Sequence, residues 1–341
     1  MQKFLTLIIA AIALTSCSQK ERIFQSNLPV EELVSRKIPI NEILVPTDML
    51  LLDDYFIIAN DYIQGENCFF VYSAKDKEFY FSFGQLGQGP DDFIAPRLVK
   101  ESRGNTLSIY DAAFGKLLKF DVTNQGAKKI SEQKITTIKY PFQHISYASD
   151  SILLFSVLTR QNVSLYSYNT EQKSIVDTLS FETKIKERMG DKYNSMFDVF
   201  HFSNCGKKFV ATFEYINQAV TGTIDEAGHF WGTDFQYPNI MLKDKATDNI
   251  LYYLFPSATE DYFYTQYYGR LFKYMQPFPI NTEGRSMDFL IEVYDWQKNI
   301  VRLLHPDSDI LRFTVDKKTN KLYTWNPLKD FDGLLEYDLN K

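Results

Sequence analysis

The sequence predicts an all-β fold, a six-bladed β-propeller built from four-stranded antiparallel blades. The first observation is composition: 28 Phe and 22 Tyr stand among 341 residues, and aromatic side chains favour strands. The second is repetition, because a unit of strand, polar turn and strand recurs six times at a spacing of about 50 residues, which is typical of propellers. Each unit alone leaves two apolar sheet faces uncovered, so the units must stack around an axis.

The six units follow one another from residue 49 to the end of the chain. Their expected strands, in order, are 49–58, 68–72 and 78–83; 106–110, 117–122 and 128–135; 151–158, 164–169 and 174–181; 208–215, 219–224 and 229–235; 261–266, 270–275, 289–295 and 299–304; and 310–316, 321–325 and 334–339. Ile185, Met189, Tyr193 and Met196 lie at helical spacing, which predicts a surface helix between the third and fourth units.

The ring needs a closing strand, because the last unit is one strand short. The segment Arg36 to Val45 has the character of a strand and precedes the first unit, so we expect it to complete the final blade. A pair of β-sandwich domains is the alternative architecture. It would need a linker near the middle of the chain, where no stretch rich in Pro, Gly or Ser occurs.

The first residues predict export. Lys3 precedes an apolar run, Phe4 to Leu14, that is too short to span a bilayer, as in a signal peptide. The sequence Leu14-Thr15-Ser16-Cys17 resembles the lipobox of bacterial lipoproteins, which implies that residues 1–16 are removed and that Cys17 carries the lipid. A buried apolar helix and a signal cleaved without lipidation are the alternatives.

We expect residues 17–35 to be the lipidated cysteine with a tether and residues 36–341 to be the propeller. Ser18 stands where some lipoproteins carry the aspartate that retains them at the inner membrane. The resemblance therefore implies an outer-membrane lipoprotein, facing either the periplasm or the surface, whose membrane partner is held through the lipid at Cys17.

Charge and cysteines limit the partners and the redox chemistry. The net charge of −6, without a cluster of Lys and Arg, excludes a nucleic-acid partner. Cys68 and Cys205 fall in the first and fourth units, which lie opposite each other in a ring of six. We therefore expect them to be too far apart for a disulfide, which needs Cα atoms within about 7 Å.

One internal motif is distinctive, the loop Phe83-Gly84-Gln85-Leu86-Gly87-Gln88-Gly89-Pro90-Asp91-Asp92-Phe93. We expect its glycines to adopt backbone angles closed to other residues, an aspartate to accept backbone N–H groups, and Phe93 to enter the core. A ligand-binding loop on one propeller face is the alternative. Its candidate residues are Gly87, Gly89, Pro90, Asp91, Asp92 and Phe93.

This loop resembles the one that follows the first blade in TolB-like six-bladed propeller lipoproteins of gut bacteria. Lipobox, length, repeat spacing and loop agree, so the resemblance covers the mature chain. Glu is more usual than Asp92 at the second acidic position. The resemblance implies a propeller, and most members of that family lack an assigned activity.

Catalytic motifs are missing from the sequence. The four histidines have no metal-ligand spacing, no Gly-x-Ser-x-Gly occurs, and paired carboxylates such as Asp53-Asp54 point in different directions. We predict no catalytic residue, no metal and no cofactor. Rings in the segment Asp261 to Tyr268 should pack between blades, with a sugar-stacking platform as the alternative.

Two functional classes remain. The first is a binding or scaffold module for a peptide, a glycan or a partner protein. The second is a carbohydrate-active hydrolase or lyase. Carboxylates that converge at the ring axis would favour the enzyme, whereas an aromatic patch would favour binding.

Overall fold

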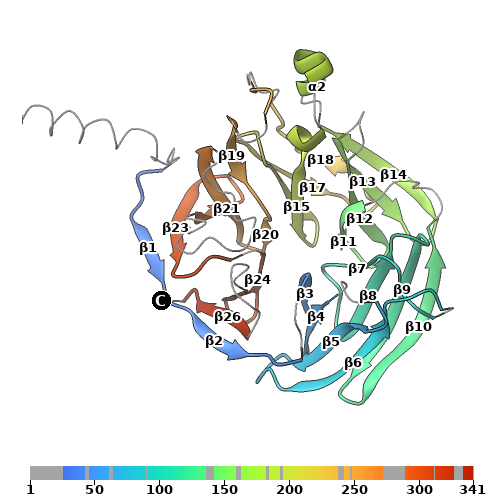
Figure 1. The fold of residues 1–341 in the computed structure, drawn as a ribbon. Coiled ribbons are helices and arrows are strands. Elements are labelled where there is room, and N and C mark those ends of the chain that lie inside the picture. The colour runs from blue at the N-terminus through green and yellow to red at the C-terminus, as the bar shows by residue number, and fades with distance from the viewer. Residues whose placement is uncertain are drawn as a thin grey trace, which may run out of the picture.

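The computed structural model is a ring of six β-sheets, the predicted six-bladed propeller (Figure 1). It describes residues 26–42, 46–60, 64–89, 91–135, 142–158, 163–181, 184–192, 195–236, 242–245, 248–271, 289–310, 312–325 and 333–340. The lipobox and Cys17 lie outside these residues. No helix in the described ranges is both long enough and apolar enough to cross a bilayer.

Blades 1 to 4 each contain four antiparallel strands, with the first strand nearest the ring axis. Blade 1 comprises β3 (Asp48–Leu51), β4 (Tyr55–Ala59), β5 (Asn67–Ser73) and β6 (Phe79–Gln85), and blade 2 comprises β7 (Pro96–Leu98), β8 (Thr106–Asp111), β9 (Lys116–Thr123) and β10 (Gly126–Lys134). Blade 3 comprises β11 (Phe142–Tyr147), β12 (Ile152–Leu158), β13 (Val163–Asn169) and β14 (Ser174–Ser180), and blade 4 comprises β15 (Phe200–Cys205), β16 (Lys208–Phe213), β17 (Ala219–Ile224) and β18 (Phe230–Trp231).

Blades 5 and 6 include the N-terminal strands. Blade 5 comprises β19 (Ile250–Tyr253), β20 (Ser257–Ala258), β21 (Tyr262–Leu271), β22 (Leu290–Asp295), β23 (Ile300–Pro306) and β1 (Val30–Leu33). Blade 6 comprises β24 (Phe313–Asp316), β25 (Lys321–Thr324), β26 (Gly333–Asp338) and β2 (Arg36–Pro39). Blade 5 thus exceeds the predicted four strands. The continuous strand β21 also replaces the break that we expected between residues 266 and 270.

The ring closes as predicted, through a strand from the N-terminal segment. β2 pairs antiparallel with β26, from Arg36 opposite Glu336 to Pro39 opposite Gly333. Gly333 has a φ of +155°, and a Cβ there would collide with the carbonyl oxygen of Ile38, so the closing pair requires glycine at this position. Residues 43–45 of the predicted strand lie outside the described residues.

The folded body begins earlier than residue 36. β1 pairs in parallel with β23 at the outer edge of blade 5, in a segment that we assigned to the tether. Arg302 holds Glu31 through three hydrogen bonds of 2.7 to 3.2 Å, and these bonds lower the pKa of Glu31. The two N-terminal strands therefore pair with the outer strands of two neighbouring blades, beside the C-terminus (Figure 1).

The first strands of the blades form a ring of neighbours in the order β3, β7, β11, β15, β20, β24 and back to β3. β7, β11 and β15 are absent from the strands predicted above, and β3 and β4 were predicted as one strand. β7 has only three residues, too few to establish a repeating pattern, and β15 is buried or half-buried along its whole length. The missed strands are those that carry residues to the ring axis.

Aromatic and aliphatic side chains fill the spaces between blades. In the segment that we expected to pack between blades, Phe263, Tyr264 and Tyr267 are buried, which agrees with that expectation. Blades 3 and 4 are joined by a short helix, α2 (Ile185–Met189), and two 3-10 turns, η1 (Gly190–Lys192) and η2 (Ser195–Asp198). The predicted helix between these blades is therefore present, but it is shorter than expected. Cys68 and Cys205 form no disulfide, as expected for opposite blades.

Candidate functional site

The distinctive loop turns back on itself and buries its last residue. The Phe93 amide donates to the carbonyl oxygen of Gln85 at 2.9 Å, and the Gly87 amide donates to that of Phe93 at 3.0 Å. The Phe93 ring is buried and meets the Phe69 ring edge-on, with centroids 5.5 Å apart. Gly84, at φ +77°, lies so close that a Cβ there would come within 2.8 Å of the Phe93 ring. The loop therefore depends on glycine for its close packing.

The second aspartate of the motif closes the turn. Gly89 donates its amide to Asp92 Oδ2 at 2.7 Å, and a Cβ at Gly87 or Gly89 would meet the Asp92 carboxylate. The side chain of Asp91 is 92% exposed and lies 3.9 Å from the Lys129 ammonium. Pro90 lies outside the described residues. Of the described candidate residues, Asp91 is the one whose side chain is directed into solvent.

The loop bounds a pocket of about 230 Å³ at the outer rim of the ring, between blades 1 and 2. Rings form much of its wall, and charged side chains lie at its edge. Its lining residues are Phe83, Gly84, Asp91, Asp92, Phe93, Asp111, Phe114, Lys116, Leu118, Phe120, Ala127, Lys129 and Glu132. Phe114 is 44% exposed, so an apolar surface is accessible there.

The carboxylates of this pocket already have partners. Glu132 accepts from Lys116 at 3.0 Å and from Lys129 at 3.3 Å, and these hydrogen bonds lower its pKa. Asp111 accepts from the amides of Ile94 at 2.9 Å and Ala113 at 3.0 Å. Both groups hold local structure, so proton transfer to a substrate would have to break these bonds.

A second group of functional side chains meets around the ring axis, where the first strands begin. His144 Nε2 lies 3.1 Å from His201 Nδ1, and His201 Nε2 lies 3.0 Å from Glu214 Oε1. The ring of Phe255 packs on His201, with centroids 4.5 Å apart. The sequence alone predicted no contact between these two histidines. The pair forms because β11 and β15, which were not predicted, bring the two residues side by side.

Cations surround this histidine pair. The Arg312 guanidinium stacks over the Phe255 ring at 4.6 Å, and its Nη1 donates to the carbonyl oxygen of Thr47 at 3.2 Å. Lys100 pairs with Asp48 at 2.7 Å. Burial holds the pKa of His144 well below its usual value, and the charges of His201, Arg312, Lys100 and Arg97 lower it further. His144 is therefore neutral at pH 7.

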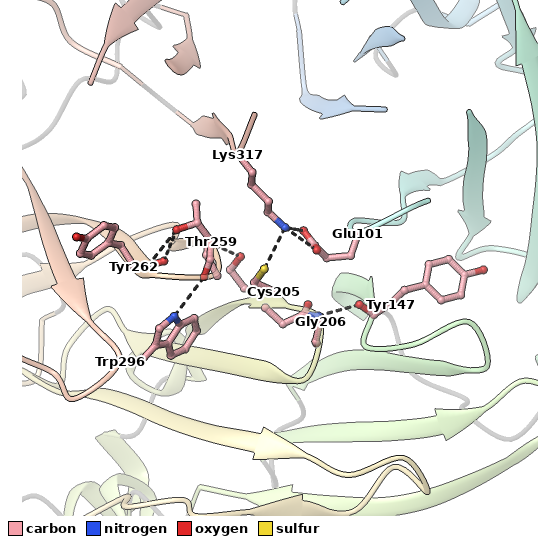
Figure 2. A network of polar contacts seen from close by, with 11 residues as sticks. Glu101, Tyr147, Cys205, Gly206, Thr259, Tyr262, Trp296 and Lys317 are labelled. Atoms are coloured by element: carbon pink, nitrogen blue, oxygen red, sulfur yellow. Dashed lines mark hydrogen bonds and ion pairs between the residues drawn. The ribbon is translucent and has the colours of Figure 1, made fainter. Parts of the chain in front are cut away.

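Where the first strands end, a different contact crosses the axis (Figure 2). Lys317 donates to both carboxylate oxygens of Glu101, at 2.6 and 2.7 Å, and lies 3.4 Å from Cys205 Sγ. Glu101 follows β7, Cys205 ends β15 and Lys317 follows β24, so the contact joins blades 2, 4 and 6. Burial raises the pKa of Cys205, which keeps the thiol protonated at pH 7.

No group of three or more His, Cys, Asp or Glu side chains within the described part of the chain is arranged to hold a metal ion. The histidine pair with Glu214 is joined by hydrogen bonds along a line. A chain of this kind can hold or pass a proton, and it places an imidazole beside Phe255 and Arg312.

Comparisons with known proteins agree with the fold. A family described as TolB-like 6-blade propeller-like matches residues 26–318. A protein of Bacteroides fragilis NCTC 9343, described as a candidate for export, is similar in structure, with a TM-score of 0.56 and 13% identity over 89% of this chain and 94% of that chain. A DUF4221 member from Bacteroides vulgatus has a TM-score of 0.56 and 12% identity over 90% and 97%. No curated protein matches this sequence.

Proposed function

Since this chain belongs to the TolB-like six-bladed propeller family, we propose that it is an exported, lipid-anchored binding protein of the outer membrane. Its ligand would occupy the pocket between blades 1 and 2. The pocket carries the proposal, because it combines an exposed aromatic surface with a charged edge next to the distinctive loop. Partnered carboxylates in this pocket support binding over the hydrolase or lyase that the sequence left open.

The pocket size and lining limit the ligand. Pockets for drug-sized molecules measure about 300–1,000 Å³, so a volume of about 230 Å³ suits one ring of a larger ligand. Phe114 offers a face for stacking, and Lys116 and Asp91 offer a donor and an acceptor beside it. A sugar ring of a glycan and an aromatic side chain of a peptide both match this chemistry.

The proposed anchor agrees with the placement of this pocket. The described chain starts beside β1 at the outer edge of blade 5, and residues 18–29 could reach at most about 40 Å when extended. Blade 2 lies opposite blade 5 in the ring (Figure 1). A lipid at Cys17 would therefore attach the body near blade 5 and leave the pocket on the far side.

Replacing Cys17 tests the anchor. We expect Cys17→Ala to move the protein from the detergent-rich to the aqueous phase in a phase-partition experiment. Mass spectrometry of the wild-type N-terminus should show an acylated peptide that begins at Cys17. An unmodified peptide, or one that begins elsewhere, would contradict the anchor and leave the pocket proposal unaffected.

Truncating one ring of the pocket tests ligand binding. On glycan and peptide arrays, Phe114→Ala should lose the signals that the full chain gives, by about tenfold or more. Phe79→Ala is the matched control, since Phe79 is 40% exposed on β6 and does not line the pocket. Equal losses in both variants, or a Phe114→Ala variant that binds like wild type, would contradict the assignment of the pocket.

A further inference from the structure

We propose that the cluster at the start of the first strands is a second ligand site, in which Arg312 binds a compact oxyanion, a carboxylate or phosphate group. We name this group of side chains, His144, His201, Glu214, Phe255 and Arg312, the axial cluster. It lies around the ring axis and shares no residue with the pocket between blades 1 and 2. The site therefore goes beyond the proposed function.

Arg312 is the central observation. Its guanidinium is half-buried, stacked on Phe255, and directed by a single hydrogen bond to the carbonyl of Thr47. A guanidinium carries five N–H donors in a rigid fork. Among the residues that the structure describes, no carboxylate pairs with Arg312. Most of its donors are thus available, in the planar geometry that matches an oxyanion.

The neighbouring charges favour an anion at this position. Three cations, Arg97, Lys100 and Arg312, lower the pKa of His144, and two carboxylates, Asp48 and Glu214, have hydrogen-bond partners in this region. Asp48 is engaged by Lys100, and Glu214 by His201. Within the described part of the chain the positive charge of Arg312 therefore has no carboxylate partner, and an oxyanion would balance it.

The histidine pair gives this site a second property. His201 lies between Glu214 and His144, so a proton held by His144 would be connected to a carboxylate through one imidazole. An anion bound at Arg312 would oppose the cations that lower the pKa of His144. Binding should therefore raise the pKa of His144, and protonation of His144 should in turn strengthen binding.

The four histidines of the chain allow a direct test by NMR. Full chain with isotope-labelled histidine is titrated with inorganic phosphate and, separately, with succinate, against sodium chloride at matched ionic strength. His229 and His305 are internal controls, because each faces a carboxylate at the periphery, Asp177 at 3.8 Å and Glu32 at 2.8 Å. We expect saturable shifts of the His144 and His201 signals with phosphate, succinate or both.

Variants distinguish binding by Arg312 from a non-specific effect of positive charge. Arg312→Gln should weaken binding at least about tenfold, because a charge-assisted hydrogen bond is lost. Arg103→Gln, which removes an exposed arginine paired with Asp150, should bind like wild type. Arg312→Lys retains the charge without the fork, and several-fold weaker binding is expected. This variant decides the question if Arg312→Gln does not fold.

Two results would overturn the proposal. Parallel shifts of all four histidine signals, or equal shifts with chloride, would indicate ionic screening or an adventitious ion only. Wild-type affinity in a folded Arg312 variant would remove the residue from the site. Failure of the Phe114→Ala experiment would not bear on this site, so the two proposals fail separately.

Discussion

The two ends of β24 differ in how their cations are satisfied. Lys317 follows the strand and is held by both oxygens of Glu101 and by Cys205. Arg312 precedes the strand and has an aromatic ring and one backbone carbonyl as partners in the described chain. One strand thus carries a cation with a carboxylate partner at one end and a cation without one at the other.

This difference separates a structural contact from a ligand site. The Lys317 contact connects three alternate blades, so it stabilises the ring by holding their ends together (Figure 2). Arg312 is held in place by stacking and by one hydrogen bond to Thr47, so most of its N–H donors have no partner among the described residues. A partly buried charge without a counter-ion is costly unless something binds it. The comparison predicts large stability effects at the Lys317 end and binding effects at the Arg312 end.

The largest effect should come from disturbing the closing strand pair of blade 6, the blade to which β24 belongs. Gly333→Ala places a Cβ against the Ile38 carbonyl and should lower the free energy of unfolding by about 3 kcal/mol. Gly126→Ala is a matched control, since Gly126 has nearly the same φ, +158°, and open space around it. Urea denaturation measures both, and equal losses would mean that the closing strand adds little.

Removing the carboxylate at the Lys317 end should have the next largest effect. Glu101→Gln leaves a partly buried ammonium without its counter-ion, and the expected loss is about 1–2 kcal/mol after allowance for partial exposure. Asp53→Asn breaks the exposed pair with Lys318 and should leave the free energy of unfolding unchanged. If the two variants lose equal stability, Lys317 does not serve as a structural contact.

Raising the pH should release the Lys317 end and leave the Arg312 end charged. Burial lowers the pKa of Lys317, but the charge and hydrogen bonds of Glu101 raise it more, so the net pKa lies above the usual value. The ion pair therefore stabilises the protein below pH 10.5 and is lost as pH rises through the folded-state pKa. We expect the stability difference between wild type and Glu101→Gln to shrink as the pH rises beyond about 10.5, the usual pKa of lysine, because the folded-state pKa of Lys317 lies above it. A constant difference would contradict the ion pair.

The sequence predicted the repeated part of the fold and not its centre. Strands such as β8, β9 and β12 show hydrophobic runs bounded by polar turns, and their expected positions hold. β7 and β20 are too short for such a pattern, and β15 is almost fully buried. β8 and β12 are themselves buried along most of their length, so their apolar runs and flanking turns made them predictable, not an exposed face.

The same reason explains the two sites. The loop from Gly84 to Phe93 is distinctive because its own backbone demands glycine, so one local segment predicted it. The axial cluster draws residues from blades 3, 4, 5 and 6, and Arg312 is 265 positions from its hydrogen-bond partner Thr47, beside blade 1. No local sequence pattern could predict that these residues lie together. In the sequence these histidines and Arg312 stand singly, so nothing in it indicated that they form one site.

Among the variants with an expected loss, Arg312→Gln should have the smallest effect on stability, and it decides the comparison. The variant loses one cation–π contact and one hydrogen bond, for which about 0.5–1 kcal/mol is expected, and it also removes an uncompensated charge. Urea denaturation beside Arg103→Gln gives the value. A loss larger than that of Glu101→Gln would show that Arg312 holds the ring as Lys317 does, and both ends of β24 would then be structural. A small loss of unfolding free energy would mean that Arg312 contributes little to stability. Its N–H donors would then be available to bind a ligand.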